Sequence, residues 1–337
     1  ARDEADMIAR TLPTVVGQNY PGPASVYLVD DCSEDGTADV ARSAAAGGNL
    51  PLTVVGGRER PAGWVGKTWA LQQGVESALS DTPHDPQFIL FTDADIAHPP
   101  DSITRLVSAA IGQERDLVSL MARLRADTAW EKLIVPAFVY FFSQLYPFRS
   151  IARRRSRTAG AAGGCVLVRT TALARAGGVA AISGAVIDDV SLGRAIKRSG
   201  GSIWLGNADQ VASLRPYPRL SDLWDMVARS AYTQLRYSVL ALAGTVIGLA
   251  VIYLGPIAVT IGGLVAGNGS VAAAGVTAWV LLTASYVPMI AYYRLGPQWV
   301  LTLPVAATIY GAMTVDSARR HYRGVGAAWK GRSYTKV

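Results

Sequence analysis

The sequence contains few of the residues that form disulfide frameworks or bind soft metals. Its 337 residues include only two cysteines, Cys32 and Cys165, and three histidines, His84, His98 and His321. Two cysteines cannot make the disulfide framework of a small secreted protein, and this scarcity favours a reducing compartment. The histidines lie near no set of metal ligands in the sequence, so no zinc site is predicted.

Charged residues are also scarce. They make up 17% of the chain, whereas hydrophobic residues make up 50%, and the mean hydropathy is +0.23. Intrinsic disorder is excluded because disordered chains combine low hydrophobicity with high charge, and the 34 Gly and 17 Pro follow no collagen-like period. The chain is too apolar for an ordinary soluble protein of this length, so part of it is expected to lie in lipid.

The net charge of +7 is concentrated near the end of the chain. From Ser238 onward, seven Lys and Arg accompany a single acid, Asp316. A nearly neutral domain followed by an apolar, basic-ended one is not the profile of a nucleic-acid binder, so no nucleic-acid partner is predicted. Because the chain begins at Ala1 without a methionine, we expect that further residues, including a first strand, lie upstream.

Residues 1 to about 215 alternate short apolar runs with helix-like segments, which predicts an α/β domain with a mostly parallel sheet and crossover helices. The domain is expected to extend to residue 237. Strands are predicted at 26–29, 52–55, 88–92, 117–120, 166–168 and 202–205. Helices are predicted to begin at Thr37, Lys67, Pro100, Thr170 and Val190.

An apolar module, 238–316, follows this domain. Residues 237–293 carry no formal charge, whereas one membrane-spanning helix needs only about 20 apolar residues. Two crossings are predicted, joined at the polar break 267–270. A third apolar segment, 299–315, is shorter, and we expect Pro304 to break it and make it re-entrant or interfacial.

The basic tail, 317–337, is expected in the cytosol, as the positive-inside tendency favours. A second membrane signal lies earlier, where the uncharged and aromatic segment 133–148 precedes five arginines. These are Arg149, Arg153, Arg154, Arg155 and Arg157. Such a pattern is typical of a helix that lies in the interface beside anionic headgroups. A core helix followed by a solvated basic turn is the alternative.

Two predicted strands run directly into acidic residues. Strand 26–29 leads to the pair 30–31, and strand 88–92 leads to Asp93 and Asp95. Ligands bind at the carboxyl ends of strands in open α/β sheets. Two carboxylates one residue apart can reach a divalent cation that phosphate oxygens also bind. An isolated Asp-x-Asp is more often a solvated turn, so a metal-binding role for Asp93 and Asp95 depends on the other motifs in the sequence.

A further pair, Asp188 and Asp189, opens a predicted helix after the small apolar run 184–187. One of two adjacent carboxylates can cap the helix while the other projects freely. A free carboxylate in a partly apolar pocket can have its pKa raised enough to act as a base. The alternative is that both residues only cap the helix.

The order of these pieces resembles the successive motifs of family-2 glycosyltransferases over residues 1–237. The pieces are Ala-Arg-Asp-Glu-Ala at 1–5, Val-Asp-Asp-Cys-Ser-Glu-Asp-Gly-Thr at 29–37, Gly-Lys-Thr-Trp-Ala-Leu at 66–71, Asp-Ala-Asp at 93–95 and Ile-Asp-Asp-Val-Ser-Leu at 187–192. Within that family, Gly63-Trp64, the second Asp-Asp and the final residues 329–334 are most similar to the hopene-associated glycosyltransferases of hopanoid-producing bacteria.

The resemblance implies a GT-A fold, in which a nucleotide-binding half-sheet holds an activated sugar donor. It implies that a divalent metal, Mg²⁺ or Mn²⁺, binds Asp93 and Asp95. Gly163 and Gly164 belong to a small-residue segment, 160–165, that would let the sugar approach the backbone. The implied donor-binding residues are Asp3, Glu4, Asp30, Asp31, Lys67, Asp93, Gly163 and Gly164.

The resemblance also implies a single inverting displacement, with Asp189 as the general base beside Asp188. Arg236 would stabilise the leaving diphosphate. It lies in 233–237, where many members have Gln-x-x-Arg-Trp, and Thr233 and Tyr237 depart from that pattern. A snorkelling Arg at the start of a membrane helix is the alternative for Arg236.

The expected function is metal-dependent transfer of a sugar, of the hexosyltransferase type, from a nucleotide-sugar donor to a membrane lipid. The donor is a UDP-sugar by family frequency, and the context is hopanoid-associated lipid metabolism. The catalytic domain is expected to face the cytosol at the cytoplasmic membrane. The alternatives are transfer to ceramide, a carotenoid, a diacylglycerol or a polyprenyl phosphate, and a non-catalytic membrane binding or assembly protein on a GT-A scaffold.

Overall fold

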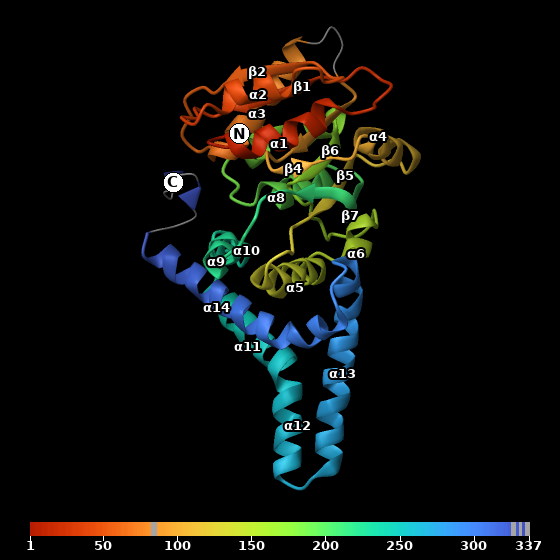
Figure 1. Ribbon diagram of the computed structural model, residues 1–337, viewed down its shortest axis with the longest axis vertical. Helices are drawn as coiled ribbons and strands as arrows, with labels where there is room; N and C mark the ends of the chain where they lie inside the picture. Colours follow the sequence, from red (N-terminus) through yellow and green to blue (C-terminus); the bar gives the residue numbers. More distant parts are fainter. Residues whose placement is uncertain (82–85, 325–327, 330–331, 334–337) are drawn as a thin grey trace. The chain divides into compact units, whose positions relative to one another are not determined.

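The computed structural model describes residues 1–81, 86–324, 328–329 and 332–333 (Figure 1). The chain forms two compact units. The first contains Ala1–Leu124 and Tyr146–Arg215, and the second contains Arg125–Leu145 and the chain from Pro216 onward. This division differs from the expected boundary after residue 237, because an internal segment belongs to the second unit and that unit resumes at Pro216.

The first unit is an α/β fold. Its strands are β1 (Val26–Asp30), β2 (Leu52–Gly56), β3 (Phe88–Thr92), β4 (Ile96–Ala97), β5 (Leu117–Arg123), β6 (Cys165–Arg169) and β7 (Ile203–Ser213). Its helices are α1 (Ala5–Val16), α2 (Thr37–Ala44), α3 (Gly66–Asp81), α4 (Ser102–Gly112), α6 (Phe148–Ala152), α7 (Thr170–Arg175), the 3₁₀ helix η1 (Val179–Ile182) and α8 (Asp188–Arg198). Each predicted strand overlaps an observed one, and each predicted helix begins within two residues of an observed start.

The sequence reasoning missed helix α1. Its buried residues Ile8, Leu12 and Val16 recur every four positions, which is the spacing of one helix face. They pack with Leu28 of β1 and Ala41 of α2. This spacing is the signal that would have identified the helix.

The prediction of a mostly parallel sheet is wrong. Strands β1 and β2 pair in parallel, and a separate five-stranded sheet has the order β3-β6-β5-β7-β4. Strand β6 is antiparallel to both of its neighbours, β4 is antiparallel to β7, and only β5 and β7 pair in parallel within this sheet. An apolar run indicates a buried strand but not its direction, which here depends on how residues 124–164 return the chain to β6.

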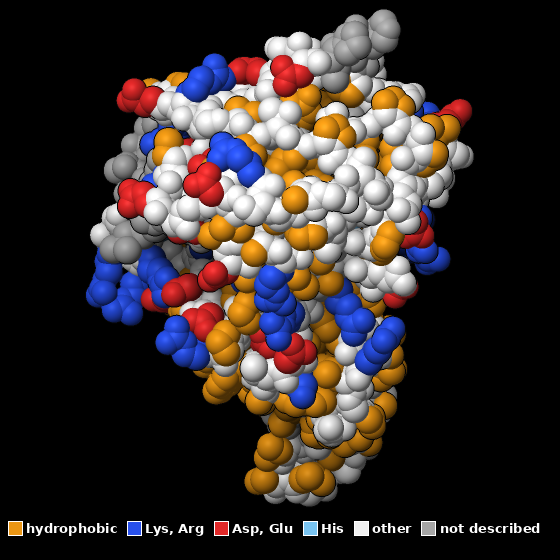
Figure 2. All heavy atoms as spheres, turned by 45° about the horizontal axis from the view of Figure 1, so that its top comes forward, with side chains coloured by type: hydrophobic (Ala, Val, Ile, Leu, Met, Phe, Trp, Pro, Cys, Tyr) orange, Lys and Arg blue, Asp and Glu red, His pale blue; other side chains and the backbone are white. Residues whose placement is uncertain are grey.

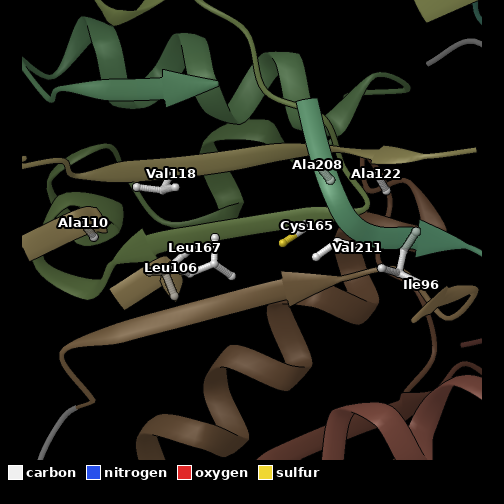
Figure 3. Close-up of a cluster of buried hydrophobic side chains, with 9 residues drawn as sticks. All are labelled: Ile96, Leu106, Ala110, Val118, Ala122, Cys165, Leu167, Ala208 and Val211. Carbon is white, nitrogen blue, oxygen red and sulfur yellow. The ribbon is translucent and has the colours of Figure 1, made fainter. Parts of the chain in front are cut away.

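Small and branched side chains form the core of this sheet (Figure 3). The cluster consists of Ile96, Leu106, Ala110, Val118, Ala122, Cys165, Leu167, Ala208 and Val211. Leu106 and Ala110 come from α4, and Val118 and Leu167 come from the neighbouring strands β5 and β6. Cys165 is fully buried, and burial raises the pKa of its thiol to about 12, as suits a packing residue.

The second unit is mainly helical. Its elements are α5 (Ala129–Leu145), α9 (Leu220–Ala228), α10 (Ala231–Gln234), α11 (Val239–Leu249), the π segment η2 (Ala250–Leu254), α12 (Gly255–Val265), α13 (Gly269–Tyr292), the 3₁₀ helix η3 (Pro297–Thr302), α14 (Leu303–Tyr322), β8 (Ala328–Trp329) and β9 (Arg332–Ser333). Strands β8 and β9 pair in antiparallel fashion. Part of the predicted basic tail and of the 329–334 motif lies outside the described residues.

Within the described residues, three segments are long and apolar enough to cross a membrane: Val239–Val265, Gly269–Tyr292 and Pro297–Tyr322. Helices α12 and α13 form a hairpin whose projecting end is covered by hydrophobic side chains (Figures 1 and 2). The chain reverses between them at Gly267, whose φ of 65° suits a glycine, so the predicted turn at the polar break is confirmed.

The predicted break at Pro304 is wrong. Pro304 lies in the first turn of α14, where a residue without an N–H loses no helical hydrogen bond, and the helix continues unbroken for 20 residues. Half of the most apolar stretch of the segment Pro297–Tyr322 is buried, whereas the buried share is 6% in Val239–Val265 and 17% in Gly269–Tyr292. Helix α14 is therefore packed among its neighbours, and it runs obliquely to the α12–α13 hairpin (Figure 1).

The aromatic segment predicted to lie in the interface forms helix α5, which packs inside the second unit, as in the alternative of a core helix followed by a basic turn. In α5, Tyr140 meets Tyr286 of α13 edge-on, with ring centroids 5.1 Å apart. Phe141 contacts Tyr253 of η2 and Tyr310 of α14, at 5.5 and 5.0 Å. One aromatic residue from each candidate span therefore packs on α5, and we call these five residues the aromatic cluster.

His98 is a buried polar residue next to the end of β3. Its side chain hydrogen-bonds Thr92 Oγ1 through Nε2 at 2.9 Å and Ser102 Oγ through Nδ1 at 3.1 Å. It is 6% exposed, and burial lowers its pKa from 6.5 to about 4. The folded protein therefore holds His98 neutral.

We expect acid to destabilise the protein in part through His98. The stability due to its depressed pKa is complete above 6.5, the unfolded value, and is lost as the pH falls towards about 4. From pH about 7 to about 5 the loss should be about 2 kcal/mol in the free energy of unfolding. Thermal unfolding of the wild type and of His98→Gln at both pH values measures it. Equal pH dependence in the two proteins would contradict this assignment.

Candidate active site

Three chain segments of the first unit bring acidic and basic groups together around Lys67. Lys67 lies in the first turn of α3, Asp93 follows β3, and Asp188 opens α8. The Lys67 Nζ atom lies 2.8 Å from Asp93 Oδ1 and 3.2 Å from Asp188 Oδ2. One ammonium group therefore bridges two of the predicted site motifs.

Two hydrogen bonds to the Ser183 carbonyl hold the start of α3 against the loop before α8. The Val65 N–H donates to Ser183 O at 2.8 Å, and Thr68 Oγ1 donates to the same carbonyl at 2.6 Å. Thr68 is fully buried. These bonds determine where Lys67 lies relative to Asp188.

Asp189 lies beside the small-residue segment. Its Oδ2 accepts a hydrogen bond from the Gly163 N–H at 2.7 Å, and its Oδ1 accepts one from the Val190 N–H at 2.6 Å. A Cβ atom at position 163 would lie 3.3 Å from both Asp189 Oδ2 and Lys67 Nζ. The backbone approaches the carboxylate this closely because residue 163 is glycine.

The environment of Asp189 raises its pKa to about 7. Burial is the largest cause and the charge of Asp188 is the next, while Lys67 and the two backbone N–H groups act in the opposite direction. For Lys67, burial acts to lower the pKa, but the charges of Asp188 and Asp93 outweigh it and raise the pKa above its usual value. The site thus combines a fixed cation with a carboxylate able to accept a proton near neutral pH.

A cavity of about 20 Å³, room for about one water molecule, lies among these groups. Its polar side is formed by Lys67, Asp93, Asp188 and Asp189. Its apolar side is formed by Leu71, Phe91, Val166, Val179, Ile182 and Leu192. This apolar wall limits solvation of the acidic pair, which accounts for the raised pKa of Asp189.

Asp95 has different partners from Asp93. Its Oδ2 accepts a hydrogen bond from Ser213 Oγ at 2.6 Å and lies 3.5 Å from Arg215 Nε. The Nη2 atom of Arg215 also donates to both carboxylate oxygens of Glu4, each at 2.8 Å. Glu4, Asp95 and Arg215 therefore form one ion-pair network.

Sequence reasoning did not identify Arg215. It lies just after β7, far along the chain from Glu4, and no local pattern marks it. Its importance follows only from the fold: Glu4 is 6% exposed, and a buried carboxylate needs a cationic partner.

The chemistry of the donor set at Asp93 and Asp95 fits a hard divalent cation. Both residues supply carboxylate oxygens, and their side chains are 35% and 17% exposed. No group of three or more His, Cys, Asp or Glu residues able to hold a metal ion occurs in the described part of the chain. A cation bound there would need further oxygens from a phosphate-bearing ligand and water, as Mg²⁺ sites commonly do.

The predicted nucleoside-binding residues lie together at the carboxyl end of β1. Asp3 Oδ1 accepts a hydrogen bond from the Glu34 N–H, and the Glu4 N–H donates to Thr37 Oγ1, both at 2.9 Å. Asp30 Oδ1 accepts one from the Ser33 N–H at 3.1 Å. Asp31 is 2% exposed. The segment 1–5 and the loop 31–37 are thereby joined into one surface.

The remaining predicted residues have other surroundings. Gly164 packs towards the core, since a Cβ there would lie 3.0 Å from Ile96 Cδ1. Arg236 belongs to the second unit and is exposed. Arg236 and Tyr237 both have left-handed backbone angles, φ 53° and 57°, and the ring of Tyr237 stacks on His321 at 4.4 Å. The role of Arg236 at a diphosphate stays a prediction.

Residues 1–177 match the family described as Glycosyl transferase family 2. The chain therefore belongs to this family, and its first unit carries a glycosyltransferase domain. The expected α/β, GT-A-like class and the family resemblance are confirmed at this level. The expectation of an enzyme of the glycosyltransferase class is confirmed as well.

Two curated relatives are undecaprenyl-phosphate 4-deoxy-4-formamido-L-arabinose transferases. The one from Aeromonas hydrophila is 36% identical over 118 residues, which are 35% of this chain and 31% of the relative. The one from Pseudomonas syringae is 31% identical over 107 residues, which are 32% of this chain and 28% of the relative. The chain thus spans about a third of the length of these relatives.

Among solved structures, S. aureus TarS matches with a TM-score of 0.43 at 16% identity, over 69% of this chain and 38% of TarS. TarS 1-349 in complex with UDP-GlcNAc matches with a TM-score of 0.40 at 14% identity, over 96% and 90% of the two chains. At these scores the likeness bears on neither the details of the fold nor the function.

We expect Arg215→Met to lower the free energy of unfolding by about 2 kcal/mol, because it removes the Nη2 group that donates to both oxygens of the buried Glu4 carboxylate. The double variant Glu4→Gln/Arg215→Met should regain part of that loss. Arg219→Met, at a side chain 78% exposed, is the matched control and should change stability by less than about 0.5 kcal/mol. Thermal or denaturant unfolding measures all three. Arg215→Met as stable as the control would refute the importance of this ion pair.

Proposed function

We propose that the protein transfers a sugar from a nucleoside-diphosphate donor to a hydroxyl group of a membrane lipid, with inversion at the anomeric carbon. The observation that carries this proposal is the surroundings of Asp189. A buried carboxylate with a pKa raised to about 7, beside a fixed ammonium, suits a general base for a hydroxyl nucleophile. The residues that the family resemblance assigns to donor binding lie on the same unit.

The proposed step is a single in-line displacement. The acceptor oxygen forms a bond to the anomeric carbon as the bond from that carbon to the donor diphosphate breaks. Asp189 accepts the proton of the acceptor hydroxyl, and the nucleoside diphosphate leaves with the electron pair. Lys67, held by Asp93 and Asp188, supplies positive charge that would stabilise the leaving diphosphate.

Asp93 and Asp95 are the residues that would hold a divalent cation, Mg²⁺ or Mn²⁺. When bound, such a cation neutralises charge that develops on a departing diphosphate. In the structure Asp93 pairs with Lys67 and Asp95 with Arg215.

The lipid nature of the acceptor is supported by the three apolar segments that are long enough to cross a membrane. A hopanoid-type lipid is the candidate suggested by the resemblance at Gly63-Trp64 and Asp188-Asp189. We also propose that the catalytic unit faces the cytosol at the cytoplasmic membrane, where nucleotide sugars are available. Arg236 would assist at the diphosphate.

A polyprenyl phosphate is the second candidate acceptor, and the names of the curated relatives favour it. The two candidates differ in their need for a base. A phosphate monoester has a second pKa of about 6, so its nucleophilic oxygen is already ionised at neutral pH. A hydroxyl group is not, and its transfer requires a proton acceptor such as Asp189.

Asp189→Asn tests the proposal and distinguishes the two acceptors. With a hydroxyl acceptor, we expect this variant to lower kcat at least about 100-fold, because the general base is lost. Wild-type activity should fall as the pH drops below about 7, where Asp189 takes up a proton. Nucleotide release is measured with a panel of nucleotide sugars and membrane lipid extract, and the glycosylated lipid is identified by mass.

Asp209→Asn, at an exposed position of β7, is the control and should retain wild-type activity. The second candidate would be supported if Asp189→Asn kept its activity on a polyprenyl phosphate within tenfold of the wild type and showed no activity on lipid hydroxyl groups. Nucleotide-sugar binding without any turnover across the panel would indicate the non-catalytic binding protein instead.

Chelation should abolish turnover, and added Mg²⁺ or Mn²⁺ should restore it, since two carboxylates alone are too few ligands to retain the metal. Asp95→Asn should raise the metal concentration for half-maximal activity at least about tenfold while leaving the protein folded. Undiminished activity in excess chelator would contradict the metal proposal without affecting the assignment of Asp189.

A further inference from the structure

Five arginines follow one another on the surface of the first unit, in α6 and the turn after it. They are Arg149, Arg153, Arg154, Arg155 and Arg157, and we call residues 149–157 the basic segment. All five are exposed. Arg154 pairs with Glu114 at 3.1 Å, whereas the other four have no acidic partner among the described residues.

The backbone of the basic segment is held in place by two further cations. Lys197 of α8 donates through Nζ to the carbonyl oxygens of Ile151 and Arg153, at 2.7 and 2.8 Å. Arg115, which precedes β5, donates through Nη1 to the carbonyl oxygen of Ala152 at 2.9 Å. The acceptors are backbone oxygens, so these contacts fix the segment while neutralising none of its charge.

The basic segment follows directly on a helix that packs against all three candidate membrane spans. Helix α5 ends at Leu145, and Arg149 comes four residues later, a length of chain that reaches at most about 14 Å. The aromatic cluster near the end of α5 contains Tyr253, Tyr286 and Tyr310, one from each span. The chain therefore leaves the apolar helices immediately before it presents these arginines.

We propose that the basic segment binds the anionic phospholipid headgroups of the bilayer in which the helical module lies. Four guanidinium groups on a fixed backbone, none with an acidic partner in the part of the chain that the structure describes, match a surface of phosphate groups in charge and in hydrogen-bonding geometry. Each Arg or Lys near an anionic membrane surface contributes on the order of fivefold to membrane affinity, so four together are a substantial electrostatic contact. This contact is independent of the reaction proposed for the active site.

Other anionic partners are less consistent with the sequence around the segment. The rest of the first unit carries more acidic than basic residues, 20 Asp and Glu against 15 Lys and Arg, which is not the profile of a nucleic-acid binder. The segment is also separated from helix α5, which packs against the candidate spans, only by residues 146–148, which include Pro147 and Phe148. A bilayer surface is the anionic partner that chain connectivity brings near it.

The test uses the full chain in nanodiscs. Ser156→Cys is labelled with an environment-sensitive fluorophore in a Cys32→Ser background, because Cys32 is exposed whereas Cys165 is fully buried. Discs of phosphatidylcholine alone are compared with discs containing about one third phosphatidylglycerol. We expect a blue-shifted emission in the anionic discs and its loss at about 1 M NaCl, where the Debye length falls to about 3 Å.

The variant Arg149→Gln/Arg153→Gln/Arg155→Gln/Arg157→Gln should lose the difference between the two kinds of disc. The matched control, Arg10→Gln/Arg42→Gln/Arg105→Gln/Arg175→Gln, removes the same charge from other exposed positions of the first unit and should keep it. If the fourfold variant does not fold, Arg149→Gln/Arg153→Gln and Arg155→Gln/Arg157→Gln should each show a smaller difference than the wild type.

Three results would overturn the proposal. The first is equal emission of the wild type in both kinds of disc. The second is an equal loss in the control and in the fourfold variant. The third is an equal or larger shift produced in phosphatidylcholine discs by free pyrophosphate or by RNA, which would assign the arginines to a soluble anion.

Discussion

The ion pairs of Lys67 are the interaction on which the arrangement of the site depends. Asp93, Asp188 and Asp189 lie close together against an apolar wall, and three carboxylates in such surroundings would repel one another and resist burial. One ammonium group, 2.8 Å from Asp93 and 3.2 Å from Asp188, offsets this repulsion. It also links the start of α3 to the end of β3 and the start of α8. The charge of Lys67 is thus structural as well as chemical, and Asp189 is the acid to which it is not directly paired.

Much of the α/β unit could be predicted because buried strands and helix starts have recognisable local sequence patterns. Apolar runs located the strands, and capping residues located most helix starts. The directions of the strands could not be predicted, since β6 lies between β3 and β5 only because of the path of residues 124–164. The site shows the same limit. The acidic motifs are local and could be found. The cationic partners of these acids could not, because Lys67, which pairs with Asp93, and Arg215, which pairs with Asp95, come from distant parts of the chain.

The helical module illustrates the difference between composition and packing. The uncharged stretch was sufficient to predict the α12–α13 hairpin and its turn. Pro304 was misjudged because its effect depends on position: in the first turn it begins a helix, and in the middle it would break one. Helix α5 has the composition of an interfacial segment, but its aromatic residues contact side chains more than a hundred positions away. No local pattern reports such contacts.

The division of the catalytic unit into two stretches of chain has a consequence for synthesis. Helix α5 is made before residues 146–215, which supply β6, α8 and β7, and long before Ser285 of α13, whose hydroxyl bonds to Tyr140 from 145 positions further along the chain. The aromatic residues of α5 are therefore synthesised well before the side chains that cover them. Early contact with the bilayer would shorten the exposure of these aromatic residues to water.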